Sequence, residues 1–247
     1  MTNSPGLGLA LALLLGWGAS TVSLMAVDLA PWPWWGVVAV VLLRTLLQTG
    51  LFIVGHDAMH GVLLPHHPRT NHGLGLAALG LYAGLAYGSC RRKHQRHHRH
   101  TATSADPDFH PNPAAGAGRW YLRFMAGYLN PGQMARLLTA WGLLVLLALP
   151  ANPSAWLNLL LFCSAPLLLS SLQLFVFGTY LPHRSQRAPG AAAGTPISLD
   201  WPAWLSLLAC YHFGYHREHH DRPDLAWFAL PGLRHQRRAL ARTEQRE

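Results

Sequence analysis

The most informative shortage in this sequence is charge. Only 12% of the 247 residues are Asp, Glu, Lys or Arg, against about 25% in an average soluble domain. Ten carboxylates and a single lysine, Lys93, are too few to cover a water-soluble globule of this size. The other basic residues are arginines, and the net charge is +9. The composition therefore disfavours an ordinary cytosolic protein.

Cysteine is also scarce. Cys90, Cys163 and Cys210 are scattered along the chain and form no CxxC pair. This pattern supports neither a disulfide framework nor a thiolate zinc site. Histidine, with 16 residues, is far more abundant. The sequence therefore has the composition of a histidine-rich membrane protein.

Long apolar runs dominate the rest of the sequence. Those long enough to cross the roughly 30 Å core of a bilayer are residues 8–27, 34–55, 131–150 and 155–182. Short turns join the first run to the second and the third to the fourth, which predicts two helical hairpins. A shorter, glycine-rich stretch, 73–88, is expected to be re-entrant or to lie in the interface, because a single crossing would separate the histidines before it from those after it. We expect an all-α integral membrane protein with one membrane-embedded domain over residues 1–247, in which a helical cap carries the histidines.

The positions of the basic residues predict the orientation. Eighteen of the nineteen, all except Arg44, fall on the side of the predicted histidine cap. Basic residues accumulate on the cytoplasmic side of a membrane, so we expect the cap to be cytoplasmic. The basic patches 91–93 and 234–242 are interpreted as anchors to anionic headgroups rather than as nucleic-acid-binding segments.

Three histidine groups carry the functional signal. One is an HxxxH motif and two are HxxHH boxes, and the i, i+3 and i+4 spacings place each group on one helical face. Eight imidazoles are too many for one ion but suit two, and imidazole alone fits iron, zinc or copper. The candidate ligands are His56, His60, His94, His97, His98, His216, His219 and His220.

Other polar residues near the boxes are candidates for supporting roles. A metal-bound imidazole commonly donates its second N–H to a carboxylate, and the candidate acceptors are Asp57, Asp106, Asp108 and Glu218. Helix capping or charge balance against arginine would explain any single one of them equally well. His110 and His212 are candidates either for hydrogen bonds to the ligands or for direct ligation. The histidines without such spacing are interpreted as interfacial or solvated: His66, His67, His72, His100 and His235.

The order HxxxH, HxxHH and a late HxxHH resembles the membrane fatty-acid desaturase and hydroxylase superfamily. Four strings resemble the bacterial β-carotene ketolases more closely: HDAMHG at 56–61, DPDFH at 106–110, FGTYLPHR at 177–184 and CYHFGYHREHH at 210–220. The similarity extends from about residue 45 to residue 235.

The resemblance implies a non-haem di-iron oxygenase that uses O₂ and electrons from an external donor such as ferredoxin. Such an enzyme oxidises C4 of the β-ionone ring twice, taking β-carotene through echinenone to canthaxanthin and zeaxanthin towards astaxanthin. It also implies a place in the bacterial inner membrane and a ninth histidine ligand, for which His183 is favoured over His212. Aromatic residues near the boxes are candidates to line a polyene tunnel, although membrane packing alone is the simpler explanation for any one of them: Phe109, Tyr211, Phe213, Tyr215, Trp227 and Phe228.

Two alternatives belong to other classes of function. Within enzymes, the alternative is a carotenoid ring hydroxylase or another di-iron membrane hydroxylase or desaturase. Outside enzymes, it is a histidine-rich metal transporter. A transporter carries its ligands near the bilayer midplane, whereas the interiors of the four apolar runs contain no histidine. The sequence therefore favours the enzyme.

Overall fold

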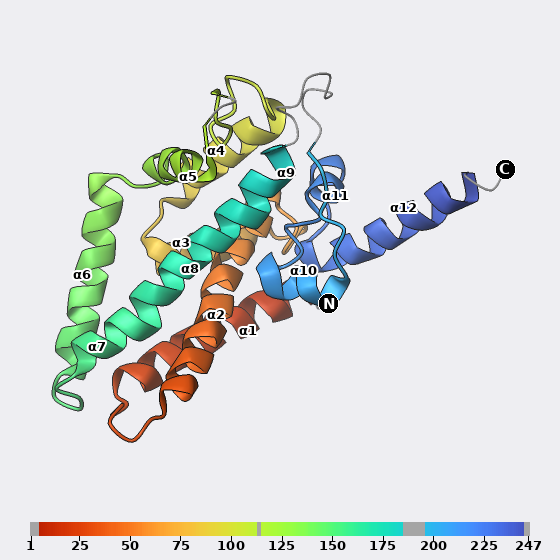
Figure 1. Cartoon of the computed structure of the whole chain (residues 1–247). Coiled ribbons are helices and arrows are strands. Elements are labelled where there is room, and N and C mark those ends of the chain that lie inside the picture. The colour runs from red at the N-terminus through yellow and green to blue at the C-terminus, as the bar shows by residue number, and fades with distance from the viewer. Residues whose placement is uncertain (1–4, 113–114, 185–195, 245–247) are drawn as a thin grey trace.

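The computed structural model describes residues 5–112, 115–184 and 196–244, and within them the chain forms helices and no strands (Figure 1). The stretches long and apolar enough to cross a membrane are α1 (Pro5–Met25), α2 (Trp34–His60), α6 (Pro131–Ala148) and Ala155–Arg184. The predicted all-helical fold with several long apolar helices is confirmed. The largest difference between a predicted run and an observed helix is in α2. This helix ends at His60 rather than at residue 55, so it includes the whole HxxxH motif.

The fourth apolar stretch is one long rod with two irregular turns. It consists of α7 (Ala155–Leu159), the π-helical turn η1 (Leu160–Ser164), α8 (Ala165–Phe175), the π-helical turn η2 (Val176–Tyr180) and α9 (Leu181–Arg184). Each π-helical turn lies just before a proline, Pro166 or Pro182. Proline has no N–H to donate to the carbonyl four residues earlier, and a π-helical turn accommodates the irregularity. The rod therefore stays continuous through two prolines.

Arg44, the lone charge in its apolar run, is buried between three helices. Its Nε atom donates to the carbonyl oxygen of Phe162 at 3.0 Å, and its Nη1 atom donates to the carbonyl oxygen of Trp17 at 2.9 Å. Phe162 lies four residues before Pro166, so its carbonyl is the one that the proline leaves without a helical partner. The guanidinium also lies 5.1 Å from the centre of the Trp17 ring. Arg44 thus links α1 and α2 to the long rod.

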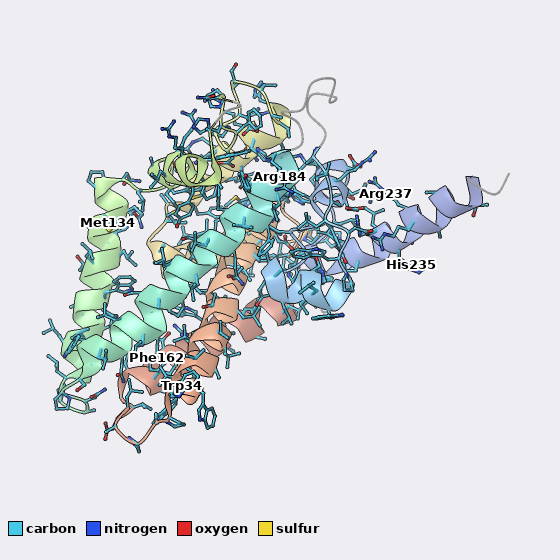
Figure 2. The ribbon with its side chains drawn as sticks, viewed as in Figure 1. Trp34, Met134, Phe162, Arg184, His235 and Arg237 are labelled. Atoms are coloured by element: carbon cyan, nitrogen blue, oxygen red, sulfur yellow. The ribbon has the colours of Figure 1, made fainter. Side chains whose placement is uncertain are left out.

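The two turns between the apolar helices meet at one end of the bundle. The Nδ2 atom of Asn152 donates to the carbonyl oxygens of Met25 and Val27 at 3.1 and 3.0 Å, and that of Asn158 donates to the carbonyl oxygen of Leu24 at 2.7 Å. Figure 1 shows these turns at the end opposite to α9 and α11. In Figure 2, Trp34 and Phe162 lie towards the turns and Arg184 lies at the other end of the bundle.

The predicted segment 73–88 contains a sharp corner. It includes most of α3 (Pro68–Ala83) and the start of α4 (Tyr87–Arg99), whose axes are bent by 100°. Gly84 makes the corner with a left-handed backbone, φ 66°, and its N–H donates to the carbonyl oxygen of Gly80 at 2.8 Å. Only glycine adopts this conformation without a steric cost. The stretch is therefore two helices rather than one uniform segment.

The remaining helices complete the histidine end. They are α5 (Ala117–Ala126), α10 (Ala203–Cys210), α11 (His216–Asp221), the 3₁₀ turn η4 (Trp227–Ala229) and α12 (Leu230–Glu244). Arg234 on α12 pairs with the buried Glu218 on α11 at 3.1 Å. Arg237 pairs with Asp221 at 2.6 Å. These pairs join α12 to the histidine end, and Figure 2 shows Arg237 and His235 on this helix.

Candidate metal centre

Four elements supply the candidate ligands, and their ends meet at one place. The last turn of α2 carries His56 and His60, and this helix ends at Gly61, which has a left-handed backbone with φ 78°. The HxxHH boxes lie on α4 and α11, and His183 lies on α9. On each box helix the i, i+3 and i+4 spacing presents three imidazoles to the same side.

The nine predicted ligands form two groups. In each group the candidate ligand nitrogens lie within 4.8 Å of one another. The first group is His56, His60, His94, His98 and His219. The second group is His97, His183, His216 and His220. Each HxxHH box contributes to both groups, so α4 and α11 link the two clusters.

The distances between imidazoles fit ligand sets around single ions. Two nitrogens bound at right angles to one ion, each with a metal–nitrogen bond of about 2.1 Å, lie about 3.0 Å apart. In the first group the Nε2–Nε2 distances are 2.7 Å for His60–His94, 3.1 Å for His94–His98 and 3.0 Å for His98–His219. In the second they are 3.2 Å for His97–His220, 3.1 Å for His216–His220 and 2.9 Å for His183–His216.

Hydrogen bonding alone does not account for this convergence. The Nε2 atom of His98 faces both His94 and His219, but a neutral imidazole has only one N–H to donate. The Nε2 atom of His56 is buried and has no hydrogen-bond partner. A metal ion would satisfy these lone pairs together, so the donor set fits a pair of imidazole-bound ions.

The surroundings favour neutral imidazoles. Burial lowers the pKa of five box histidines outside the long apolar helices, and the neighbouring imidazoles lower it further: His94, His98, His216, His219 and His220. A neutral ring keeps a lone pair on one nitrogen, which is the form that binds metals. The site is therefore electrostatically suited to cations.

Asp106 orients His97. Its Oδ1 atom lies 2.9 Å from Nδ1 of His97, and its Oδ2 atom accepts the N–H of Ala102 at 2.9 Å. Burial alone would lower the pKa of His97 and raise that of Asp106, but their hydrogen bond and opposite charges reverse both directions. A His97 ring that donates from Nδ1 directs Nε2 into the second group. Asp106 thus fulfils the geometry expected of a supporting carboxylate.

Asp57 stands in a similar relation to His56. Its Oδ1 atom lies 3.2 Å from Nδ1 of His56, and its Oδ2 atom accepts the N–H of Trp227 at 3.1 Å. Both side chains are buried. The carboxylate therefore joins the last turn of α2 to the segment that precedes α12.

The other two nominated carboxylates have different partners. Glu218 accepts from the Ser198 hydroxyl and pairs with Arg234, so it supports the packing of α11 against α12. Asp108 pairs with Lys93, with 3.3 Å between Oδ1 and Nζ. Proximity in sequence to a histidine box therefore did not identify the contacts of these two residues.

His212 and His110 lie outside both groups. Helix α10 ends at Cys210, and His212 has a left-handed backbone with φ 65°, so no continuous helix connects it to His216. Its ring stacks on that of Tyr215, with centroids 5.6 Å apart. The Nδ1 atom of His110 accepts the N–H of Asn112. Among the two candidates for a ninth position, the structure brings His183 to the cluster and leaves His212 away from it.

An apolar cavity shares part of its lining with a smaller cavity at the two histidine groups. It has a volume of about 210 Å³ and lies between α2, α3, α5, α6 and the long rod. The smaller cavity, of about 40 Å³, is lined by His56 and His94 of the first group and by His97 and His216 of the second. The side chains that line both cavities are Phe52, Phe124, Tyr128 and Leu174. These four side chains thus separate the apolar cavity from the cavity that the histidines line.

The aromatic lining differs from the expected one. Of the six aromatics nominated from the sequence, Phe213 lines the histidine cavity. Phe109 packs on Trp120 and Tyr211 packs on Trp227, with centroids 5.5 and 5.0 Å apart. Phe52 was missed, although it lies four residues before His56 on the same helical face. No histidine box lies near Phe124 and Tyr128 in the sequence, so their place in the cavity could not be predicted from spacing.

A third pocket, with mostly polar lining residues, adjoins the first histidine group. It has a volume of about 350 Å³ and is lined by His60, Gln95, His98, Arg99 and Pro223. Arg99 is exposed. His60 and His98 of the first group therefore line a pocket of their own, apart from the cavity that His56 and His94 line.

Comparisons with known proteins agree with the geometry. The family described as fatty acid desaturase matches residues 32–246. A β-carotene ketolase of Haematococcus lacustris is 43% identical over 207 residues, covering 80% of this chain and 62% of that protein. A zeaxanthin 4-ketolase of Chlamydomonas reinhardtii is 40% identical over 214 residues, covering 84% of this chain and 46% of that protein. The chain thus spans less than two thirds of the length of these two algal relatives.

A bacterial relative matches at nearly full length. The β-carotene ketolase of Paracoccus sp. (strain PC1) is 39% identical over 241 residues, which is 92% of this chain and 91% of that protein. The resemblance inferred from the histidine boxes and the four longer strings is confirmed. Because both the family match and this alignment cover most of the sequence, the chain belongs to the fatty acid desaturase family, in the group of the β-carotene ketolases.

Proposed function

We propose that this protein is a carotenoid 4-ketolase, an oxidoreductase that introduces a keto group at C4 of β-ionone rings. The observation that carries the proposal is the set of side chains that the apolar cavity shares with the cavity at the two histidine groups. A carotene is a long hydrocarbon, and a cavity lined by Phe, Leu and Met side chains can accept it from the lipid. The names of the relatives supply the substrate class. The products are echinenone and canthaxanthin from β-carotene, with astaxanthin from zeaxanthin.

Two iron ions are the proposed cofactors. The first would be held by His56, His60, His94, His98 and His219, and the second by His97, His183, His216 and His220. Iron bound in this way supplies the activation of O₂. Asp106 and Asp57 would hold His97 and His56 with one nitrogen facing the ions. The spacing of the Nε2 atoms and the unpartnered Nε2 of His56 support this assignment.

The proposed reaction balances over two rounds of oxidation. In each round one oxygen atom of O₂ enters a C–H bond at C4. The other oxygen leaves as water with two protons and two electrons from an external donor such as ferredoxin. The first round converts the methylene to a secondary alcohol, and the second converts the alcohol to a geminal diol. The diol loses water to leave the ketone.

The protein's own residues position the ring for this chemistry. Phe52, Phe124 and Leu174 line both cavities and would pack around the ring where the apolar space meets the histidines. Their side chains exclude water, which favours a bound hydrocarbon. The polyene chain would extend from there through the apolar cavity and towards the lipid.

The chain is a membrane protein, and its arrangement in the bilayer is part of the proposal. Helices α1 and α2 would form one hairpin, and α6 and the long rod would form the other, within a single membrane-embedded domain over residues 1–247. The bent pair α3 and α4 would be re-entrant, with the histidine end on the cytoplasmic face of a bacterial inner membrane. Trp34 and Trp35, which are exposed near the opposite turns, suit a membrane interface.

Pigment analysis in a carotene-producing cell tests the function. Expression of this chain should convert β-carotene to ketones, whose added C=O extends the conjugation and reddens the pigment. A His219→Ala variant, which lacks one proposed ligand, should leave the carotene unchanged at the same protein level. Recovery of rings that carry hydroxyl groups alone would show that the chain is a ring hydroxylase instead.

A further inference from the structure

A buried ion pair lies beside the histidine cavity, and the metal site does not use it. Lys93, the one lysine of the chain, pairs with Asp108 at 3.3 Å. Their side chains are only 15% and 8% exposed. Asp108 is the one carboxylate among the described residues that line the histidine cavity. Burying two charges is costly, so this pair calls for an explanation.

The surrounding residues hold Asp108 in place. Its N–H donates to Oδ1 of Asp106 at 2.9 Å, and its carbonyl oxygen accepts from Nε1 of Trp120 at 2.8 Å. Asp106 is also the residue that pairs with His97. The DPD sequence therefore directs one carboxylate to a histidine and the next to the cavity.

Lys93 is held just as tightly. Its Nζ atom lies 3.5 Å from the centre of the Tyr128 ring, a cation–π contact. A Cβ atom at Gly127 would come within 2.4 Å of the same Nζ, so glycine leaves the room that the ammonium needs. Tyr128 in turn lines both the apolar cavity and the histidine cavity. The ion pair is thus fixed at the boundary between the two cavities.

The chemistry of the substrate suggests what this carboxylate meets. A β-carotene ring has no polar atom and gains nothing from a carboxylate. After the first oxidation the ring has a hydroxyl group, which costs free energy in an apolar site unless it is hydrogen-bonded. A hydrogen bond to an ionised acceptor is stronger than one between neutral groups. The ketone has no O–H to donate, so it loses this interaction.

We propose that Asp108 binds the hydroxyl group of the half-oxidised ring and retains it for the second oxidation. Lys93 is a positioning residue that keeps the carboxylate at the cavity boundary. The inference rests on the proposed ketolase function and adds a binding site for hydroxylated rings to it. The alcohol would then stay in the site, while the ketone, which has no O–H to donate, would leave it.

The test replaces both charges at once. A Lys93→Met, Asp108→Leu double variant removes the pair without leaving either charge alone, a change that is often neutral for stability. The matched control removes the exposed pair Arg222–Asp224, 2.7 Å apart, by Arg222→Gln and Asp224→Asn. Bound iron per chain is measured for both variants. Their affinities for β-carotene and for β-carotene with a C4 hydroxyl group are measured by tryptophan quenching, without O₂ so that neither ligand is oxidised.

The expected result is a selective loss. The double variant should bind the hydroxylated ring roughly ten-fold more weakly, the equivalent of one hydrogen bond to a charged group. Its affinity for plain β-carotene and its iron content should match those of the control. In turnover it should accumulate 4-hydroxylated rings, with KM raised for the hydroxylated substrate alone.

Three outcomes would contradict the inference, and they can be told apart. If the unaltered chain forms ketones and the double variant forms them in the same proportion, with unchanged affinities, Asp108 does not bind the hydroxyl group. Loss of iron or of affinity for both substrates would also overturn it, because Asp108 would then support the site as a whole. If the unaltered chain forms no ketone, the proposed function itself is wrong, and the inference with it.

Discussion

The Nε2 atoms of His183 and His216 lie 2.9 Å apart, although the two residues are separated by 33 positions in the sequence. His183 follows Pro182 at the end of the long rod, and His216 begins α11. The rod carries its π-helical turn η2 directly before this point. The contact joins an apolar helix to the last histidine box and completes the second group.

The contact predicts different metal losses for two histidine variants. His183→Ala removes a member of the second group, so we expect it to reduce bound iron. His212→Ala should retain iron, because His212 stacks on Tyr215 outside both groups. Iron per chain in the purified variants is the measurement. Full iron in the His183 variant beside a loss in the His212 variant would reverse the assignment.

Asp106→Asn should weaken metal binding without removing a ligand. The amide cannot reproduce the charged acceptor at Nδ1 of His97, and loss of such a partner typically costs 10–100-fold in metal affinity or activity. Chelator competition on the purified protein measures the effect. Asp224→Asn, at an exposed ion pair, is the control and should leave affinity unchanged. Equal affinities in the two variants would remove Asp106 from the metal site.

Arg44→Lys should destabilise the apolar bundle. Arg44 donates to the carbonyl oxygens of Phe162 and Trp17 and to the Ser20 hydroxyl, and a lysine ammonium lacks the planar fork that reaches all of them. We expect a loss of about 2–4 kcal/mol in the free energy of unfolding. Thermal unfolding in detergent measures it. Leu43→Ala, an exposed neighbour, should change stability by about 0.5 kcal/mol or less, and a similar small effect of Arg44→Lys would contradict the bridging role.

The proposed orientation can be tested with single cysteines. The three native cysteines are buried, so a cysteine placed at the exposed Ala151 or Ala241 offers a distinct reactive thiol. A membrane-impermeant maleimide added to intact cells with a permeable outer membrane should label Ala151→Cys. It should label Ala241→Cys only after the inner membrane is opened. The opposite pattern would place the histidine end outside the cytoplasm. The neighbouring Asn152 is a poorer position for a label, because its Nδ2 atom donates to the carbonyl oxygens of Met25 and Val27.

Local spacing made the histidine boxes predictable. The pairs His94–His98 and His216–His220 meet because a helix returns to the same face after four residues. The same rule explains why Glu218 turns away: it lies two residues after His216, on another side of α11, where it pairs with Arg234. Adjacency in sequence is therefore a weaker guide than helical phase.

Contacts between distant segments were not predictable in this way. His183 was chosen through the family resemblance and its position after Pro182, whereas the exclusion of His212 depends on the left-handed backbone at Tyr211 and His212. Nothing local to Asp108 indicates that Lys93 is its partner. Arg44 and Phe162 are 118 positions apart, and only the folded bundle shows that the carbonyl freed by Pro166 faces the guanidinium.

The reaction of the purified protein with β-carotene, before and after iron is removed and restored, tests the central claim most directly. With O₂ and a reduced ferredoxin present, we predict C4 ketones from protein that holds two iron ions per chain. Chelation should abolish the product, and Fe²⁺ should restore it where Zn²⁺, which has no redox chemistry, does not. Ketone formation that survives the loss of iron, or iron-loaded protein that yields only hydroxylated rings, would contradict the account.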